Sequence, residues 1–168
     1  VLAVLHWSRR QLPEQRAELY DAAIEYLLES RRELSAYTTI QRRQCFEALA
    51  LRMFLGDRGT QRTIGRGDAA AIVAPFLSTQ ANPVSFADAL AFLEAEETTS
   101  GIVVSRQEGE VEFWHLTFQE YLAALGLSHA REHEKLLGPR ANDGYWPVLK
   151  PFVFDDRWSE VVLLLGGC

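Results

Sequence analysis

The stretch GIVVSRQEGEVEFW, residues 101–114, decides the fold of this 168-residue chain. Its two ends, residues 101–105 and 110–114, are short runs that hold β-branched and aromatic side chains. The residues between them, Arg106 to Gly109, are polar and end on a glycine. Two such runs on either side of a short polar turn are typical of a β-hairpin. This is the only convincing hairpin pattern in the sequence.

Three segments with helical spacing precede the hairpin, at residues 40–55, 69–79 and 86–97. The third has a capping-box-like start, because Ser85 can accept a bond from the helix and Asp88 can reach back. Three helices followed by a hairpin are the order of a winged helix. We therefore predict a mainly α fold, a winged helix flanked by helical subdomains. The expected apolar faces are Ile40, Phe46, Leu49, Ala50, Met53 and Phe54, then Ile72, Val73, Phe76 and Leu77, then Phe86, Leu90, Phe92 and Leu93.

The connection between the first two helices is predicted from glycine and aspartate. Gly56 ends the first helix, and residues 57–67 form a loop that contains glycine and arginine. Asp68 is the expected cap of the second helix. The arginines of the loop fit a mobile connection, or a contact with an acidic partner or a neighbouring domain.

Helical patterns also lie on both sides of the predicted winged helix. Residues 1–8 have the pattern of the end of a buried helix, and Pro13 and Glu14 begin a new one. After the hairpin, Thr117 and Glu120 form an expected capping box that starts another helix.

The end of the chain completes the predicted division into domains. Asp156 can cap a last helix over residues 158–165, which stops at Gly166. We expect residues 1–36 to end a helical domain, residues 37–116 to form the winged helix and residues 117–168 to start a following helical domain. The first residue is not Met and the apolar pattern is already under way there, so we expect a piece of a longer polypeptide.

Charge and cysteine content restrict the function classes. The net charge of −6 and the pI of about 5.2 are poorly suited to non-specific nucleic-acid binding. The two cysteines are too few for a disulfide framework, which favours a reducing, cytoplasmic compartment. The sequence has no signal-peptide pattern, and its apolar runs are far shorter than the ~20 residues of a membrane span.

The sequence lacks the motifs of a catalytic site. It contains no G-x-x-x-x-G-K-[ST] loop, no acidic Walker B strand and no G-x-S-x-G. His129, Glu132 and His133 match H-x-x-E-H, but a catalytic zinc needs a third protein ligand, and few candidates follow. We interpret that motif as a solvated helix face. We therefore predict no catalytic residue and no metal ligand.

DNA reading is disfavoured by the charges of the third predicted helix. In DNA-binding winged helices this helix offers basic or amide side chains to the major groove. Here it contains Asp88, Glu94, Glu96 and Glu97 and no basic residue. A surface for protein and interdomain contacts is the better interpretation.

Residues 113–124, FWHLTFQEYLAA, carry a family resemblance. They resemble the F-x-H-x-[ST]-F-Q-E-[YF]-L-A-A signature of NACHT-type STAND signalling NTPases, which lies where the winged helix meets the following helical domain. Residues 100–103 resemble the strand that leads into it, and residues 12–28 and 158–164 are similar to flanking helices of the same family. The resemblance implies a fragment that covers the end of the first helical domain, the winged helix and the start of the second helical domain.

The resemblance also implies a function for the parent protein. In this family ATP, with magnesium, replaces ADP on triggering, the winged helix moves and the protein oligomerises, in antiviral defence or innate immunity. The fragment itself would be no enzyme and would hold no cofactor. Its partner would be the missing nucleotide-binding domain of the same chain, with no membrane involved.

By motif position, His115 corresponds to the family histidine that touches the β-phosphate of ADP in the closed state. A histidine before a helix N-terminus is also placed to donate to an anion, although a core-edge histidine bonded to a backbone carbonyl remains an alternative. The rest of the motif is expected to serve capping and interdomain packing. These residues are Phe113, Trp114, Thr117, Phe118, Gln119, Glu120 and Tyr121. Three other functions stay open, namely a DNA-binding regulator, a zinc hydrolase and a stand-alone scaffold.

Overall fold

The computed structural model describes residues 15–30, 32–56, 61–79 and 81–168. Within them, α3 (Thr39–Phe54), β1 (Thr63–Gly65), α4 (Arg66–Leu77), α5 (Phe86–Thr99), β2 (Val103–Ser105) and β3 (Glu110–Phe113) follow one another. This is a mainly α winged helix, as predicted from the sequence. The predicted residues 1–8 and the helix start at Pro13 lie outside the described residues.

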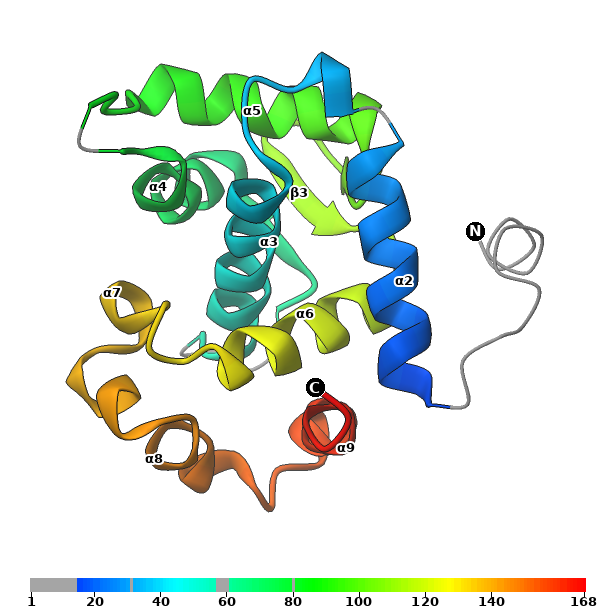
Figure 1. Ribbon diagram of the computed structural model, residues 1–168, viewed down its shortest axis with the longest axis vertical. Helices are drawn as coiled ribbons and strands as arrows, with labels where there is room; N and C mark the ends of the chain where they lie inside the picture. Colours follow the sequence, from blue (N-terminus) through cyan, green and yellow to red (C-terminus); the bar gives the residue numbers. More distant parts are fainter. Residues whose placement is uncertain (1–14, 31, 57–60, 80) are drawn as a thin grey trace.

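Helix α3 is the centre of the molecule, with α4, α6 and α2 packed around it (Figure 1). Because neighbours cover it on several sides, its residues from Cys45 to Leu51 are all buried. Its start is a capping box that the sequence analysis missed. The Thr38 hydroxyl accepts from the backbone N–H of Gln41, and the Gln41 side chain accepts from that of Thr38. Ile40, expected on the buried face, is 70% exposed, because it lies on the side of α3 that lines an open groove together with Arg43 and Gln44.

The start of α4 corrects one prediction and that of α5 confirms another. Gly65 precedes the first residue of α4, so Asp68 lies inside the first turn and does not cap the helix. In α5, Ser85 and Asp88 form the expected capping box. Phe86, expected to be buried, is 54% exposed, because it is the first residue of that helix.

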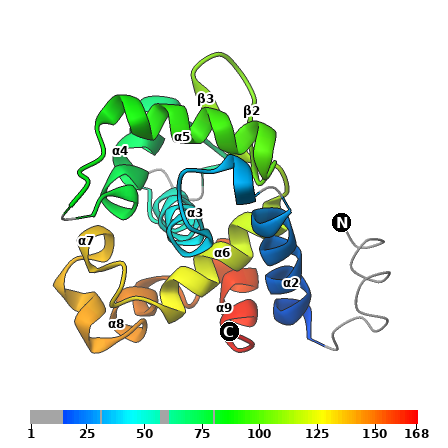
Figure 2. The same ribbon diagram turned by 45° about the horizontal axis from the view of Figure 1, so that its top comes forward.

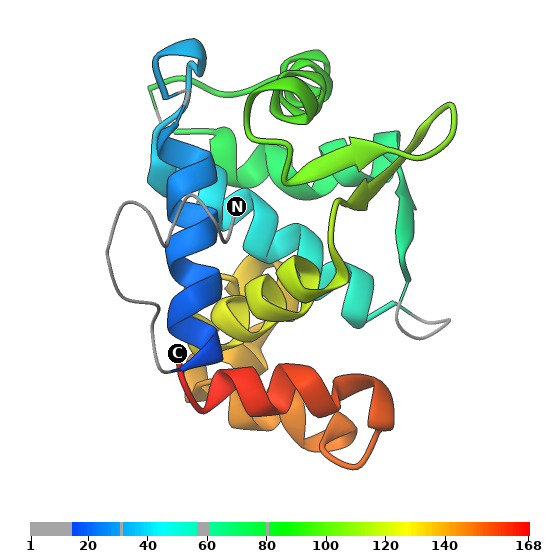
Figure 3. The same cartoon turned by 90° about the vertical axis from the view of Figure 1, so that its right-hand side faces the viewer.

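A three-stranded antiparallel sheet with the order β1-β3-β2 completes the winged helix. The predicted hairpin is confirmed, with Val103 opposite Phe113. In Figure 3 it projects beyond the helices. Strand β1 lies within the predicted loop of residues 57–67, so that part of the prediction is wrong. Its three residues pair with β3, which places Ile64 opposite Val111.

A buried ion pair joins three helices of the core. The Arg42 guanidinium donates to both carboxylate oxygens of Glu96 in α5, from Nε at 2.6 Å and from Nη2 at 2.9 Å. Its Nη1 donates to the carbonyl of Leu28, near the end of α2 (Arg16–Glu29), at 2.5 Å. Both ionised side chains are almost completely buried. The short helix η1 (Arg32–Leu34) follows α2.

Helix α6 (Leu116–Ser128) crosses α3 closely, and the remaining elements of the chain follow it (Figure 2). A Cβ at Gly126 would lie 2.7 Å from Cδ1 of Leu51, so the glycine permits the crossing. The elements after α6 are α7 (Glu134–Leu137), η2 (Pro139–Asp143), α8 (Trp146–Leu149), η3 (Lys150–Phe152), η4 (Asp156–Trp158) and α9 (Ser159–Leu165).

Helix α9 packs against α6 and is anchored by Trp158, which stacks on Phe152. The expected cap of this helix at Asp156 is wrong, because α9 begins at Ser159 and its N-cap, Trp158, makes no side-chain cap bond. The Asp155 side chain caps the preceding η4 instead, where it accepts the N–H of Arg157. Gly166 ends the helix as predicted. None of the helices in the described part of the chain is long and apolar enough to span a membrane.

Candidate functional site

The candidate site is the junction at which β3 ends and α6 begins. Phe113 is the last residue of β3, and the N–H of Trp114 still donates to the carbonyl of Ile102 at 2.9 Å. His115 then has an extended backbone and is the N-cap of α6. The strand and the helix thereby hold His115 from both sides.

The side chain of His115 caps α6. Its Nδ1 accepts from the backbone N–H of Thr117 at 3.2 Å, and the Thr117 hydroxyl lies 2.6 Å from the same nitrogen. An N–H can only donate, so the neutral ring carries its proton on Nε2. The His115 side chain is exposed, which leaves this Nε2–H open to a ligand.

The predicted capping box of Thr117 and Glu120 is wrong. The helix begins at Leu116, one residue before Thr117, and the capping acceptor is an imidazole nitrogen. The sequence was misleading because Thr117 and Glu120 have the spacing of a capping box. Threonine is also a far more common N-cap than histidine, so the sequence favours Thr117 over His115. Glu120 is half-buried, and burial together with the nearby Glu160 raises its pKa, although Arg16 and Arg62 oppose the shift.

Three aromatic residues of the motif lie within three positions of His115 in the sequence. Phe113 and Phe118 are buried, and Phe113 packs edge-on to Phe46 in α3. Trp114 is 58% exposed, with its ring 6.4 Å from that of Phe118. Phe113 and Phe118 therefore belong to the core, whereas Trp114 presents an apolar surface beside His115.

Gln119 and Tyr121 attach α6 to its neighbours. The buried Gln119 donates from Nε2 to the carbonyl of Gln61 at 2.9 Å, which fixes the segment that leads into β1. The Tyr121 hydroxyl donates to Asp21 of α2 at 2.9 Å, and Arg43 of α3 pairs with the same carboxylate. Burial raises the pKa of Tyr121, and the Asp21 carboxylate adds to the shift.

The H-x-x-E-H motif has a structural role that the sequence analysis did not identify. His129 and His133 contact the buried Glu47 of α3, through Nδ1 at 3.3 Å and Nε2 at 2.7 Å. The expected solvated helix face is thus wrong, since His133 is fully buried and residues 129–133 are turns rather than helix. No signal within the motif could have revealed Glu47, which lies 82 and 86 residues away.

These ionisable groups alter one another's proton affinity. Burial opposes ionisation of Glu47, but the hydrogen bonds from His129 and His133 outweigh it and lower the pKa of Glu47. The bond with Glu47 raises the pKa of His129. Among the described residues, no group of three or more His, Cys, Asp or Glu side chains is arranged to hold a metal ion.

The family assignment follows from the matched domain and the geometry together. The model of a family described as the winged helix-turn-helix domain C-terminal to NACHT matches residues 16–127, two thirds of the chain. The chain belongs to this family. It matches no curated protein and no solved structure.

The family match supports a NACHT-associated fragment with a non-catalytic domain. The matched range includes α2 at one end and most of α6 at the other. The predicted domain boundaries at residues 36 and 116 fall inside it and remain predictions.

Proposed function

We propose that this chain is the regulatory module of a NACHT signal-transduction ATPase, which closes over ADP in the resting state and moves on activation. The parent protein would bind ADP or ATP with magnesium in its nucleotide-binding domain and would self-oligomerise. A cytoplasmic role in antiviral defence or innate immunity fits this proposal. The observation that carries it is the orientation of the His115 ring.

The proposed contact joins Nε2 of His115 to the β-phosphate of ADP. The helix cap occupies Nδ1, which leaves Nε2 as the exposed donor. The ring also lies at the N-terminus of α6, whose partial positive charge favours an anion. A hydrogen bond to a charged phosphate oxygen is stronger than one between neutral groups. The contact from His115 would therefore stabilise the ADP-bound, closed state substantially.

Trp114 would add an apolar contact to the same partner. It precedes His115 and is 58% exposed, whereas most of the large apolar side chains of the domain are buried. An exposed tryptophan next to a polar anchor is typical of a protein interface. The nucleotide-binding domain of the same chain is the partner that we propose for it.

The test separates phosphate binding from helix capping in the full-length parent protein. His115→Ala removes both the cap and the donor, whereas His115→Asp keeps a good cap and places a negative charge where the phosphate would lie. We expect wild type to retain ADP on purification and both variants to lose it. If His115→Asp retains as much ADP as wild type, the phosphate contact is refuted and the chain reduces to a packing scaffold.

A DNA-binding function has less support. Glu94 and Asp88 lie exposed on α5, the helix that would enter the groove. Arg66 forms an ion pair with Glu97, and Arg106 in the β2–β3 hairpin forms one with Glu112. The hairpin, which is the wing of the fold, therefore has little unpaired positive charge. Salt-dependent binding of the chain to duplex DNA would reverse this interpretation.

A further inference from the structure

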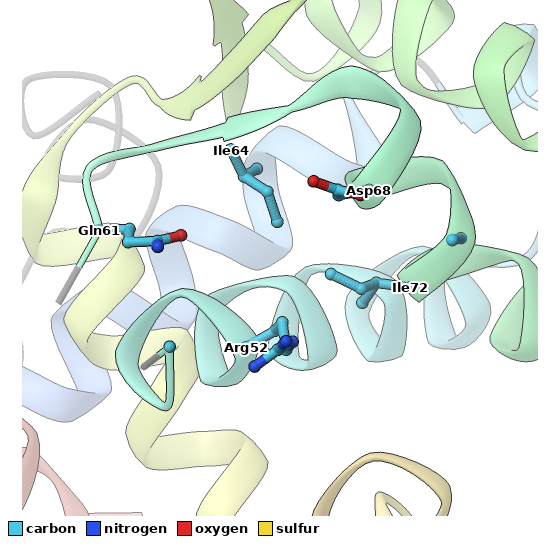
Figure 4. A pocket seen from close by; sticks show the side chains of 7 residues that line it. Arg52, Gln61, Ile64, Asp68 and Ile72 are labelled. Atoms are coloured by element: carbon cyan, nitrogen blue, oxygen red, sulfur yellow. The ribbon is translucent and has the colours of Figure 1, made fainter. Parts of the chain in front are cut away.

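A pocket opens between the end of α3, strand β1 and the first turns of α4 (Figure 4). Its volume is about 400 Å³, within the range of small-molecule sites. The lining residues are Arg52, Gly56, Gln61, Ile64, Asp68, Ala71 and Ile72.

The pocket combines an apolar middle with polar ends. Ile64 is buried and Ile72 is half-buried, and both point into the space from β1 and α4. Gln61 and Asp68 point into it from opposite sides (Figure 4). Arg52 lines the same pocket from α3.

The charges at this pocket are not neutralised within the protein. Several arginines, such as Arg42 and Arg66, lie within 4 Å of a carboxylate. In the part of the chain that the structure describes, Arg52 and Asp68 have neither an ion pair nor a side-chain hydrogen bond. The hydrogen bonds of Gln61 use its backbone, so its side-chain amide is also available to a ligand.

We propose that this pocket binds a small zwitterion with an aliphatic side chain, an amino acid or short peptide. The ligand carboxylate would pair with Arg52, its ammonium with Asp68, and its side chain would cover Ile64 and Ile72. This charge pattern suits a zwitterion better than a simple ion, because Asp68 repels phosphate and Arg52 repels an amine.

This site is separate from the proposed nucleotide contact but connected to it through one hydrogen bond. The carbonyl of Gln61 accepts from Gln119 of α6, the helix that His115 caps. A ligand that contacts Gln61 would therefore touch a segment that is hydrogen-bonded to α6. The inference goes beyond the proposed function, and its test needs no nucleotide.

The experiment titrates the 168-residue chain with the dipeptide Leu-Leu and follows backbone amide resonances by NMR. We expect shifts at Arg52, Gln61, Ile64, Asp68 and Ile72, with a Kd on the order of 1 mM, as suits a small ligand in an open site. N-acetyl-Leu-Leu and Leu-Leu amide each lack one charge and should bind about threefold more weakly, because exposed ion pairs are modest.

Variants assign each charge to its partner. Arg52→Ala should weaken the binding of Leu-Leu about threefold and leave the binding of Leu-Leu amide unchanged. Asp68→Asn should weaken the binding of Leu-Leu about threefold and leave the binding of N-acetyl-Leu-Leu unchanged. Ala71→Phe fills the pocket and should abolish the shifts. Arg140→Ala, at an exposed arginine outside the pocket, is the control. The proposal is overturned if Leu-Leu at about 10 mM, tenfold above the expected Kd, leaves these resonances unmoved. It is also overturned if N-acetyl-Leu-Leu or Leu-Leu amide binds as tightly as Leu-Leu.

Discussion

Removal of one partner from the buried Arg42–Glu96 pair should destabilise the protein more than removal of both. Glu96→Leu leaves the Arg42 guanidinium buried with only the Leu28 carbonyl as a partner. Breaking such a pair costs about 3–5 kcal/mol, because an uncompensated charge stays in the core.

The double variant Arg42→Met with Glu96→Leu removes the buried charge altogether. It still leaves the Leu28 carbonyl without its donor, which costs about 1–3 kcal/mol. Apolar replacement of a buried pair is otherwise often neutral or stabilising. The double variant should therefore be more stable than Glu96→Leu, by about 2 kcal/mol.

Urea unfolding followed by circular dichroism at the helical band measures these free energies. Arg42→Met alone completes the double-mutant cycle. The reasoning is refuted if the two single costs add up in the double variant, because the pair would then contribute no coupling. A cost of Glu96→Leu below about 1 kcal/mol would also contradict it, since that is the cost of an exposed pair.

Three further predictions concern α6 and its contacts. Gly126→Ala should lower the melting temperature by a few degrees, because the overpacking against Leu51 costs up to about 3 kcal/mol and the better helix propensity of alanine offsets only about 1. A higher melting temperature would contradict the close crossing. Glu47→Gln should destabilise the protein most between about pH 4.5 and 6.5, which are the ordinary pKa values of a glutamate and a histidine. The lowered pKa of Glu47 gives stability that is lost as the pH falls through that pKa. The raised pKa of His129 gives stability that is lost as the pH rises through that pKa. Melting curves of wild type and variant from pH 4 to 9 test this, and a difference in melting temperature that stays constant with pH would refute the linkage. His115→Ala should cost the isolated chain about 1 kcal/mol in urea unfolding, whereas His115→Asp, which keeps a cap, should cost less.

Local patterns in the sequence predict the helices, the hairpin and one cap. Ser85 and Asp88 were found because both halves of their capping box lie within four residues. The hairpin was found because its strands are joined by a short turn. Strand β1 was missed because its three residues form their ladder with β3, whose first paired residue is Glu110, far along the chain. Neither its length nor its composition is distinctive.

The sequence places His115 between the hairpin and the next helix, but it does not give the contacts of the candidate site. The motif located His115, whereas its capping role depends on the extended backbone of His115, which lets its side chain accept the N–H of Thr117. The bonds of Gln119 to Gln61 and of His133 to Glu47 depend on how the helices pack. Sequence periodicity predicts which face of a helix is buried, but not which polar group it meets there.

The central claim is tested most directly by comparing ADP with AMP on the full-length parent protein. Only ADP has the β-phosphate that His115 is proposed to contact. Isothermal titration should show His115→Asp weakening ADP at least about tenfold, as expected for loss of a hydrogen bond to a charged group, and leaving AMP within about twofold of wild type. Equal effects on both nucleotides, or none on either, would contradict the proposed contact.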